Sequence, residues 1–136
     1  MKAETQDAKS KLQVLIVEDS PTIARLIKAV LGTIGVSRIT LAGDGGEALE
    51  KVEQATDPFG LVICDWMMPG MDGIQFLEQF RKTNQTVPFV MLTAKSTAED
   101  FSDAKNLGAT YFFMKPLDPD ELLMRLEAVI ETMIQQ

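Results

Sequence analysis

The sequence contains no histidine and only one cysteine, Cys64. The missing histidines exclude histidine-based catalytic triads, histidine-ligated zinc and a phosphohistidine relay within the chain itself. A single cysteine cannot form an internal disulfide, which fits a reducing compartment. Because Cys64 lies in an apolar stretch, we interpret it as part of the core and not as a nucleophile.

Basic residues are also scarce relative to acidic ones: 13 Lys and Arg stand against 20 Asp and Glu, for a net charge of −7. This balance argues against direct binding to nucleic acid, which depends on attraction to phosphates. No apolar run is long enough to cross a bilayer, and the N-terminal "MKAETQDAKS" lacks the apolar core of a signal peptide. We therefore expect a cytoplasmic protein that does not insert into membranes.

The length of 136 residues and the 46% of hydrophobic residues predict one ordinary globular domain. We expect residues 1–10 to form a flexible tail, because they are polar throughout, and residues 11–136 to form the domain. The chain after the tail alternates between short apolar runs and segments with helical spacing. The expected strands are 12–17, 37–42, 61–64, 87–93 and 110–114, and the expected helices begin near 20, 44, 72, 97 and 118. This alternation predicts an α/β fold, a five-stranded doubly wound parallel sheet with five helices.

Capping residues mark where several of these helices start. Ser20 precedes Pro21, and Asp118 precedes Pro119, each placing proline at the first helical position. For the helix near residue 97, the capping pair is either Ser96 with Glu99 or Thr97 with Asp100. Gly32 or Gly35 ends the first helix.

Polar residues stand at the carboxyl ends of the expected strands, where ligands bind in sheets of this kind. They are Glu18, Asp19, Asp65, Thr93 and Lys115; Ala94 follows Thr93, and Pro116 follows Lys115. Three carboxylates brought together repel one another unless a cation joins them. Mg²⁺, or Mn²⁺ in its place, accepts such oxygen ligands. We expect Asp19 and Asp65 to bind the ion directly, Glu18 to bind it through water, and Met67 to offer its backbone carbonyl.

Asp65 can also accept a phosphoryl group as an acyl phosphate. Thr93 would then hydrogen-bond one phosphoryl oxygen, and Lys115 would pair with another. Each residue has a plainer interpretation: Asp19 can help to cap a helix, Thr93 can be an ordinary strand residue, and Lys115 with Pro116 can simply end a strand. Their joint placement at four strand ends favours the phosphate site.

Four motifs carry a resemblance to a known family. They are "VEDS" (17–20), "CDWMMPGMDG" (64–73), "MLTAK" (91–95) and "MKPLD" (114–118). Over residues 11–134 the chain resembles the receiver domain of bacterial two-component response regulators, most of all the stand-alone chemotaxis type. The resemblance implies the strand order 2-1-3-4-5 shared with flavodoxin-like folds, with Asp65 as phosphoacceptor and Glu18 and Asp19 as the acidic pair.

The resemblance also implies roles for residues around Asp65. Thr93, Ala94, Lys115 and Phe112 become the phosphate-binding and switch set, and the bond between Lys115 and Pro116 is expected to be cis. Met67 and Lys95 take the positions that tune dephosphorylation. Phe112 stands where tyrosine is common, so it lacks a hydroxyl for a partner. Strand alternation predicts that Tyr111 faces away from Phe112.

The implied protein is a signalling switch and not an enzyme. It takes phosphate from the phosphohistidine of a partner histidine kinase or phosphotransfer protein and later loses it to water. Phosphorylation is expected to move Thr93 and Phe112 and to change the face formed by helix 97–107, strand 110–114 and the last helix. That face carries Lys95, Asp100, Asp103, Lys105 and Glu121. No DNA-binding helix pair follows, so we expect a protein target: a motor, a kinase or an effector.

Four rival functions remain to be compared. A flavin carrier needs a phosphate-cradling loop where "VEDSP" places two carboxylates, and no Gly-x-x-x-x-Gly-Lys supports a nucleotide site. A dehalogenase-type phosphatase needs a second aspartate where Met67 stands. A pseudo-receiver that binds partners without taking phosphate would carry the same residues.

Overall fold

The computed structural model describes residues 2–94 and 97–135. Five parallel strands form one sheet in the order β2-β1-β3-β4-β5. The strands are β1 (Gln13–Val17), β2 (Arg38–Ala42), β3 (Leu61–Asp65), β4 (Phe89–Thr93) and β5 (Tyr111–Met114). The predicted doubly wound parallel sheet and its strand order are confirmed.

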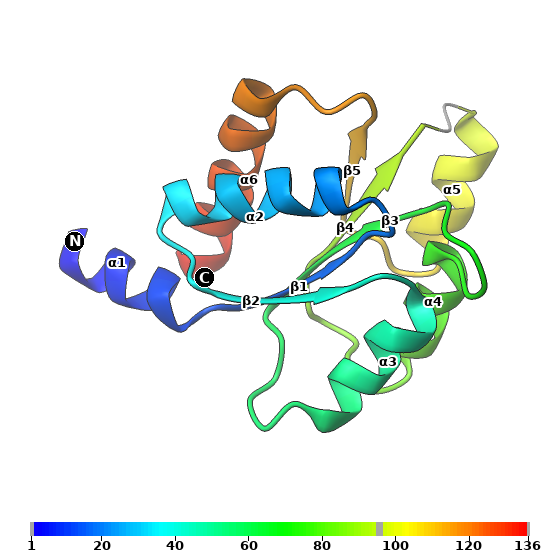
Figure 1. The fold of residues 1–136 in the computed structure, drawn as a ribbon, viewed down its shortest axis with the longest axis horizontal. Helices are drawn as coiled ribbons and strands as arrows, with labels where there is room; N and C mark the ends of the chain where they lie inside the picture. The colour runs from blue at the N-terminus through cyan, green and yellow to red at the C-terminus, as the bar shows by residue number, and fades with distance from the viewer. Residues whose placement is uncertain (1, 95–96, 136) are drawn as a thin grey trace.

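Helices cover both faces of this sheet (Figure 1). The described residues form α1 (Lys2–Lys11), α2 (Pro21–Ile34), α3 (Gly45–Gln54), α4 (Gly73–Arg81), α5 (Ala98–Asn106) and α6 (Pro119–Ile134). Helices α2 and α6 pack on one face, and α3, α4 and α5 pack on the other. Among the helices of the described chain, none has the length and apolar character needed to span a bilayer.

Helix α1 lies where residues 1–10 were expected to form a flexible tail, and it is the sixth helix where five were expected. Its sequence has no apolar stripe, which is why periodicity gave no sign of it. It is rich in good helix formers, with Glu4 in its first turn and lysines in its last, as suits the helix dipole. Asp7 and Lys11 add an ion pair at 3.0 Å. The helix lies beside the C-terminal end of α6, where Thr5 and Ile134 line a common pocket.

The helix starts follow the capping residues that the sequence indicated. Ser20 caps α2, Thr97 caps α5 and Asp118 caps α6, each through a side-chain oxygen that accepts a backbone N–H. The alternative cap at Ser96 lies outside the described residues. Helix α2 ends at Gly35, whose φ of 113° is the left-handed conformation that glycine adopts without strain.

The core consists of two layers separated by the sheet. Val14 and Ile16 of β1 point into the layer beneath α2 and α6, whereas Leu15 and Val17 point into the opposite layer. Both layers are apolar because the central strands are covered on each face, as parallel sheets require. The alternation of side chains therefore fixes which strand residues meet which helices.

The strand register brings the carboxyl ends of the central strands together at one end of the sheet. Val17 lies beside Cys64, so the next residue of each chain segment, Glu18 after β1 and Asp65 at the end of β3, lies at the same level. Thr93 of β4 pairs with Met114 of β5, and Lys115 comes next. These residues, which are distant in the sequence, therefore meet at the carboxyl end of the sheet.

Candidate phosphoacceptor site

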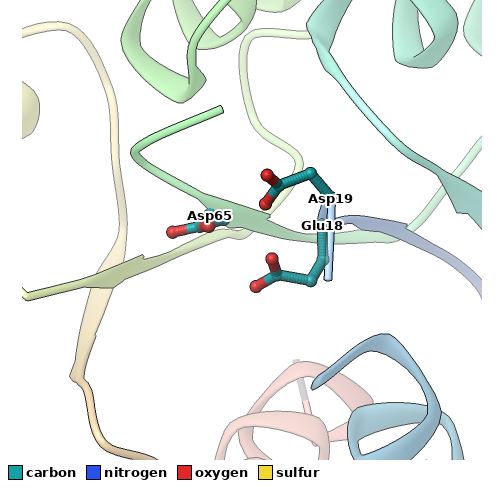
Figure 2. A group of neighbouring side chains, drawn as sticks. All are labelled: Glu18, Asp19 and Asp65. Carbon is teal, nitrogen blue, oxygen red and sulfur yellow. The ribbon is translucent and has the colours of Figure 1, made fainter. Parts of the chain in front are cut away.

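Three carboxylates gather at the edge where β1 and β3 end. Asp65 is the last residue of β3, and Glu18 follows β1; each is only 4% exposed. Asp19, the next residue, is exposed. Each of the three offers a carboxylate oxygen, and these oxygens lie within 4.8 Å of one another (Figure 2). The carboxyl ends of the central strands therefore hold a compact acidic cluster.

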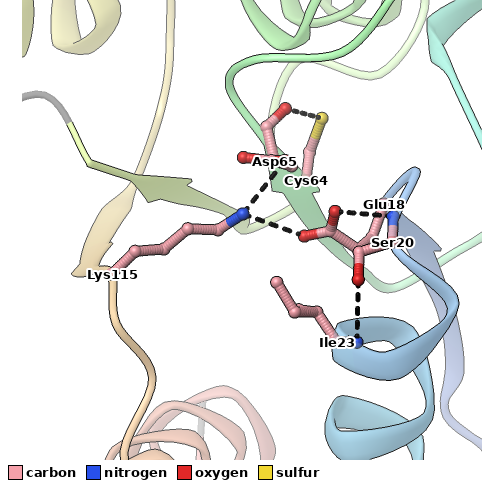
Figure 3. A network of polar contacts seen from close by, with 6 residues as sticks. All are labelled: Glu18, Ser20, Ile23, Cys64, Asp65 and Lys115. Carbon is pink, nitrogen blue, oxygen red and sulfur yellow. Dashed lines mark hydrogen bonds and ion pairs between the residues drawn. The ribbon is translucent and has the colours of Figure 1, made fainter.

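Lys115 reaches this cluster from the end of β5. Its Nζ lies 3.1 Å from Asp65 Oδ2 and 3.3 Å from Glu18 Oε1, so one ammonium group bridges two carboxylates (Figure 3). Burial acts to lower the pKa of Lys115, but the hydrogen bond and charge of Asp65 and those of Glu18 outweigh it, and the pKa is raised. Lys115 is therefore firmly cationic at neutral pH.

The surroundings of Glu18 make its carboxylate costly to ionise. Burial, together with the charge of Asp65, raises its pKa to about 7, although the backbone N–H of Ser20 and the charge of Lys115 act in the opposite direction. The Ser20 N–H lies 3.1 Å from Glu18 Oε2, and Ser20 Oγ accepts the N–H of Ile23 to cap α2 (Figure 3). The cap is thus supplied by Ser20, and the Asp19 carboxylate lies with the acidic cluster instead.

The donor set fits a hard divalent cation. Three carboxylates and one ammonium leave two negative charges when all are ionised, and each carboxylate offers an oxygen ligand to the cluster (Figure 2). Mg²⁺ takes such ligands and keeps several waters, whereas softer ions prefer sulfur or imidazole. The chain has no histidine, and the thiol of Cys64 donates to the backbone carbonyl of Asp65 at 3.2 Å. Burial raises the pKa of the Cys64 thiol, which keeps it protonated.

The loop after β3 folds back tightly on Asp65. The N–H of Gly73 donates to the carbonyl of Trp66 at 2.9 Å, which brings the start of α4 against the strand end. A Cβ at position 73 would collide with the Asp65 carbonyl oxygen and lie 2.9 Å from the Trp66 Cα. Only glycine fits there, so the "MDG" of the motif has a steric role. Met67, which lies in the same loop, is 63% exposed.

The remaining predicted residues lie around this cluster. Thr93 is fully buried at the end of β4, and the exposed Ala94 follows it. The peptide bond between Lys115 and Pro116 is cis. Phe112 and Tyr111 pack into opposite core layers, as strand alternation predicted. Lys95 lies outside the described residues.

Sequence reasoning missed two residues that hold Phe112 in place. Phe101 of α5 meets the Phe112 ring edge-on, with centroids 5.3 Å apart and planes at 68°. Arg125 of α6 donates from Nη2 to the Phe112 carbonyl at 3.1 Å. One signal was present for the first, because Phe101 is the one large apolar residue of the polar helix "AEDFSDAKN". The second depends on a contact between separate elements and leaves no pattern in the sequence.

Residues 14–127 match the family described as response regulator receiver domain. The chain belongs to this family. The resemblance stated from the four motifs is thereby confirmed, and the chain is a receiver domain of the two-component kind used in signal transduction. Receiver domains generally bind Mg²⁺ at an acidic pocket, and the cluster of Glu18, Asp19 and Asp65 provides one here.

Curated relatives extend beyond the part that this receiver domain matches. "Uncharacterized transcriptional regulatory protein YkoG" of Bacillus subtilis is 35% identical over 120 residues, covering 88% of this chain and 51% of the relative. "Transcriptional regulatory protein ZraR" of Klebsiella oxytoca is 35% identical over 127 residues, covering 93% and 28%. The chain thus spans about half or less of these relatives. Their names bear on the prediction that nucleic acid is not a direct partner, which remains a prediction from the acidic charge of this chain.

Solved structures of similar length match the receiver domain closely. The chemotaxis response regulator CheY4 of Vibrio cholerae is 34% identical with a TM-score of 0.78, covering 87% of this chain and 98% of that one. The CheY of a CheX-CheY-BeF3-Mg complex from Borrelia burgdorferi is 30% identical with a TM-score of 0.80, covering 87% and 88%. The fold and its family are therefore shared with chemotaxis-type receivers.

Proposed function

We propose that this receiver domain is a signalling switch that takes a phosphoryl group on Asp65 in a Mg²⁺-dependent reaction. The donor is the phosphohistidine of a partner histidine kinase or phosphotransfer protein. The observation that carries this proposal is the carboxylate of Asp65 at the end of a central strand, beside two further carboxylates and 3.1 Å from the Lys115 ammonium. A carboxylate needs such surroundings, because it must receive a group that is itself negatively charged.

The transfer requires one bond to form as another breaks. A carboxylate oxygen of Asp65 bonds to phosphorus while the phosphorus–nitrogen bond breaks, and the electron pair remains on the donor's histidine. Later, water attacks the phosphorus, the bond to the Asp65 oxygen breaks, and inorganic phosphate leaves with the proton going to solvent. The chain accelerates its own phosphorylation and dephosphorylation in this scheme but turns over no separate substrate.

Each neighbouring residue has a role in this scheme. Asp19, Asp65 and the Met67 carbonyl would hold Mg²⁺ directly and Glu18 through water, and the ion, when bound, neutralises charge on the phosphoryl oxygens. The Thr93 hydroxyl would donate to one phosphoryl oxygen, and Lys115 would move from the Asp65 carboxylate to another. Met67 is placed to tune attack by water, because its exposed side chain lies two residues after Asp65.

The readout of the switch is the face formed by α5, β5 and α6. Phe112, next to the strand end that carries Lys115, packs its ring on Phe101 of α5. Met114 of β5 and Met124 of α6 are 41% and 73% exposed, and flexible methionines suit a surface that binds a partner protein. A change at Thr93 and Phe112 would alter this face, which a motor, kinase or separate effector then recognises.

The sharpest test follows Trp66, the one tryptophan, which adjoins Asp65. We expect Mg²⁺ to change Trp66 fluorescence and a small phosphodonor, such as acetyl phosphate, to change it further while phosphate that is labile to acid and to base accumulates on the protein. Asp65→Asn should lose the donor-dependent change and at least about 90% of the bound phosphate, because no carboxylate remains to accept it.

Asp57→Asn is the matched control, because Asp57 is an exposed aspartate that pairs loosely with Arg38 at 3.7 Å. It should behave like the unchanged protein. If the unchanged protein takes up no phosphate and Trp66 ignores both additions, the proposal is wrong, and constitutive partner binding by a pseudo-receiver takes its place. Phosphate that persists in Asp65→Asn would place the acceptor elsewhere.

A further inference from the structure

Phe112 is held from two sides by two different helices. Its ring meets Phe101 of α5 at 5.3 Å, and its carbonyl accepts a hydrogen bond from Arg125 of α6 at 3.1 Å. The first contact lies in the core layer beneath α3, α4 and α5, and the second reaches the backbone of the strand itself. A movement of Phe112 therefore acts on α5 through the side chain and on α6 through the backbone.

Arg125 has contacts with two successive residues of β5. Besides the bond to the Phe112 carbonyl, its guanidinium lies 4.4 Å from the centroid of the Phe113 ring, which is close for a cation–π contact. Its third partner, Glu121, is 3.8 Å away in an ion pair on the exposed surface of the same helix, where such pairs contribute little. The contacts that hold the Arg125 side chain in place are therefore those between α6 and β5.

The position of β5 in the sheet bears on what the contacts of Arg125 can do. It is one of the two edge strands of the sheet, and among the described residues it pairs only with β4. Met124, which is 73% exposed, precedes Arg125 directly on α6. Arg125 therefore contacts β5 on one side and adjoins an exposed part of α6 on the other.

We propose that Arg125 is a positioning residue that couples the phosphorylation state of Asp65 to α6, through its bond to the Phe112 carbonyl and its stacking on Phe113. This inference rests on the proposed function. When Phe112 follows Thr93, the carbonyl bond shifts or breaks, and α6 adjusts at Arg125 and Met124. A purely structural Arg125 would stabilise both states equally and would leave the response of α6 to phosphorylation unchanged.

The test compares two responses of the full chain to beryllofluoride with Mg²⁺, a phosphoryl mimic. Trp66 fluorescence reports whether the site at Asp65 is filled, and deuterium uptake by residues 119–134 reports α6. In the unchanged protein we expect both to respond. In Arg125→Met, which keeps a long apolar stem but no donor or charge, Trp66 should respond at a similar concentration, while the change in α6 uptake falls by about threefold or more.

Arg25→Met is the matched control. The Nε of Arg25 also donates to a backbone carbonyl, that of Pro21 at 3.2 Å, but donor and acceptor both belong to α2. This variant should keep the full response of α6. Arg125→Lys, which keeps a charged donor, should restore most of it.

Three outcomes would overturn the inference. A full α6 response in Arg125→Met would show that Arg125 is structural. An equal loss in Arg25→Met would show that the effect is not specific to the contact with β5. If Arg125→Met does not fold, the guanidinium NMR signal of Arg125 in the unchanged protein decides: assigned through Arg125→Lys, it must shift on addition of beryllofluoride, and an unmoved signal overturns the proposal. A missing Trp66 response in the unchanged protein would instead refute the proposed function.

Discussion

Gly73 shows how single residues shape the surroundings of Asp65. The backbone of β3 and the start of α4 approach so closely that a methyl group at position 73 would collide with the Asp65 carbonyl oxygen. The same contact carries the hydrogen bond from the Gly73 N–H to the Trp66 carbonyl at 2.9 Å. Because the loop is pinned in this way, the position of the Asp65 carboxylate depends on a residue that has no chemical function of its own.

Replacing Gly73 tests this steric role. Gly73→Ala must push the start of α4 away from β3, and we expect the free energy of unfolding to fall by about 1–3 kcal/mol, as for other overpacked sites. The Mg²⁺ concentration needed for half of the Trp66 response should rise, because Asp65 shifts relative to Asp19. Urea unfolding and a Mg²⁺ titration measure the two effects.

Gly32→Ala provides the comparison for that experiment. Among the described residues, a Cβ at Gly32 would meet no atom within 4 Å apart from its chain neighbours and the backbone of its own helix, α2. Alanine should therefore stabilise the protein by about 0.5–1 kcal/mol without altering the Mg²⁺ titration. A Gly73→Ala protein as stable as the unchanged one would contradict the steric argument.

At the scale of elements, α1 is the part that distinguishes this chain from the matched family region. The family match begins at residue 14, one residue into β1, so α1 lies outside it. Gln6 of α1 has its side-chain amide 3.0 Å from the position of a Cβ on Gly35, and Thr5 lines a pocket with Ile134. The helix thus joins the end of α2 to the end of α6.

Removing residues 2–10 should separate this packing from the site. We expect the free energy of unfolding to fall by about 1 kcal/mol, because α1 is polar and buries little apolar surface. The Mg²⁺ titration of Trp66 should stay unchanged, since the length of β1, about 17 Å, separates α1 from Glu18. Unchanged stability would show that α1 does not support α6, and a weakened Mg²⁺ response would show coupling across the sheet.

At the scale of the whole molecule, charge governs how the domain responds to its surroundings. The net charge is −7, and three of the carboxylates converge at one edge of the sheet. Salt of any kind screens the general repulsion. A cation bound at the acidic cluster should stabilise the folded chain beyond screening, because the unfolded chain has no such cluster.

We therefore expect MgCl₂ to raise the Tm more than NaCl at equal ionic strength. At ten times its dissociation constant, Mg²⁺ should add about 1.4 kcal/mol to the free energy of unfolding. Asp19→Asn should lose most of this excess, because it removes a proposed direct ligand, whereas Asp57→Asn, outside the acidic cluster, should keep it. Equal shifts from the two salts would mean that the cluster does not bind the ion selectively.

Much of the fold and most of the candidate site could be predicted because each depends on a local pattern with a physical cause. Apolar runs form buried parallel strands. Ser20, Thr97 and Asp118 are capping residues, and they indicate where α2, α5 and α6 begin. The carboxyl ends of parallel strands share one edge, so Glu18, Asp65 and Lys115 had to meet once the strand order was right.

Tertiary structure alone decided the features that no local pattern encodes. Helix α1 has no apolar stripe, so only its packing against α6 gives it a place. The ring contact between Phe101 and Phe112 and the bond from Arg125 join side chains from separate elements, whose relative positions follow from the packing of both helices on β5. The sequence determined which residues form the acidic cluster and its lysine, because strand ends are local features. The assembled fold decided how that cluster is connected to the surface, because those contacts exist only between elements.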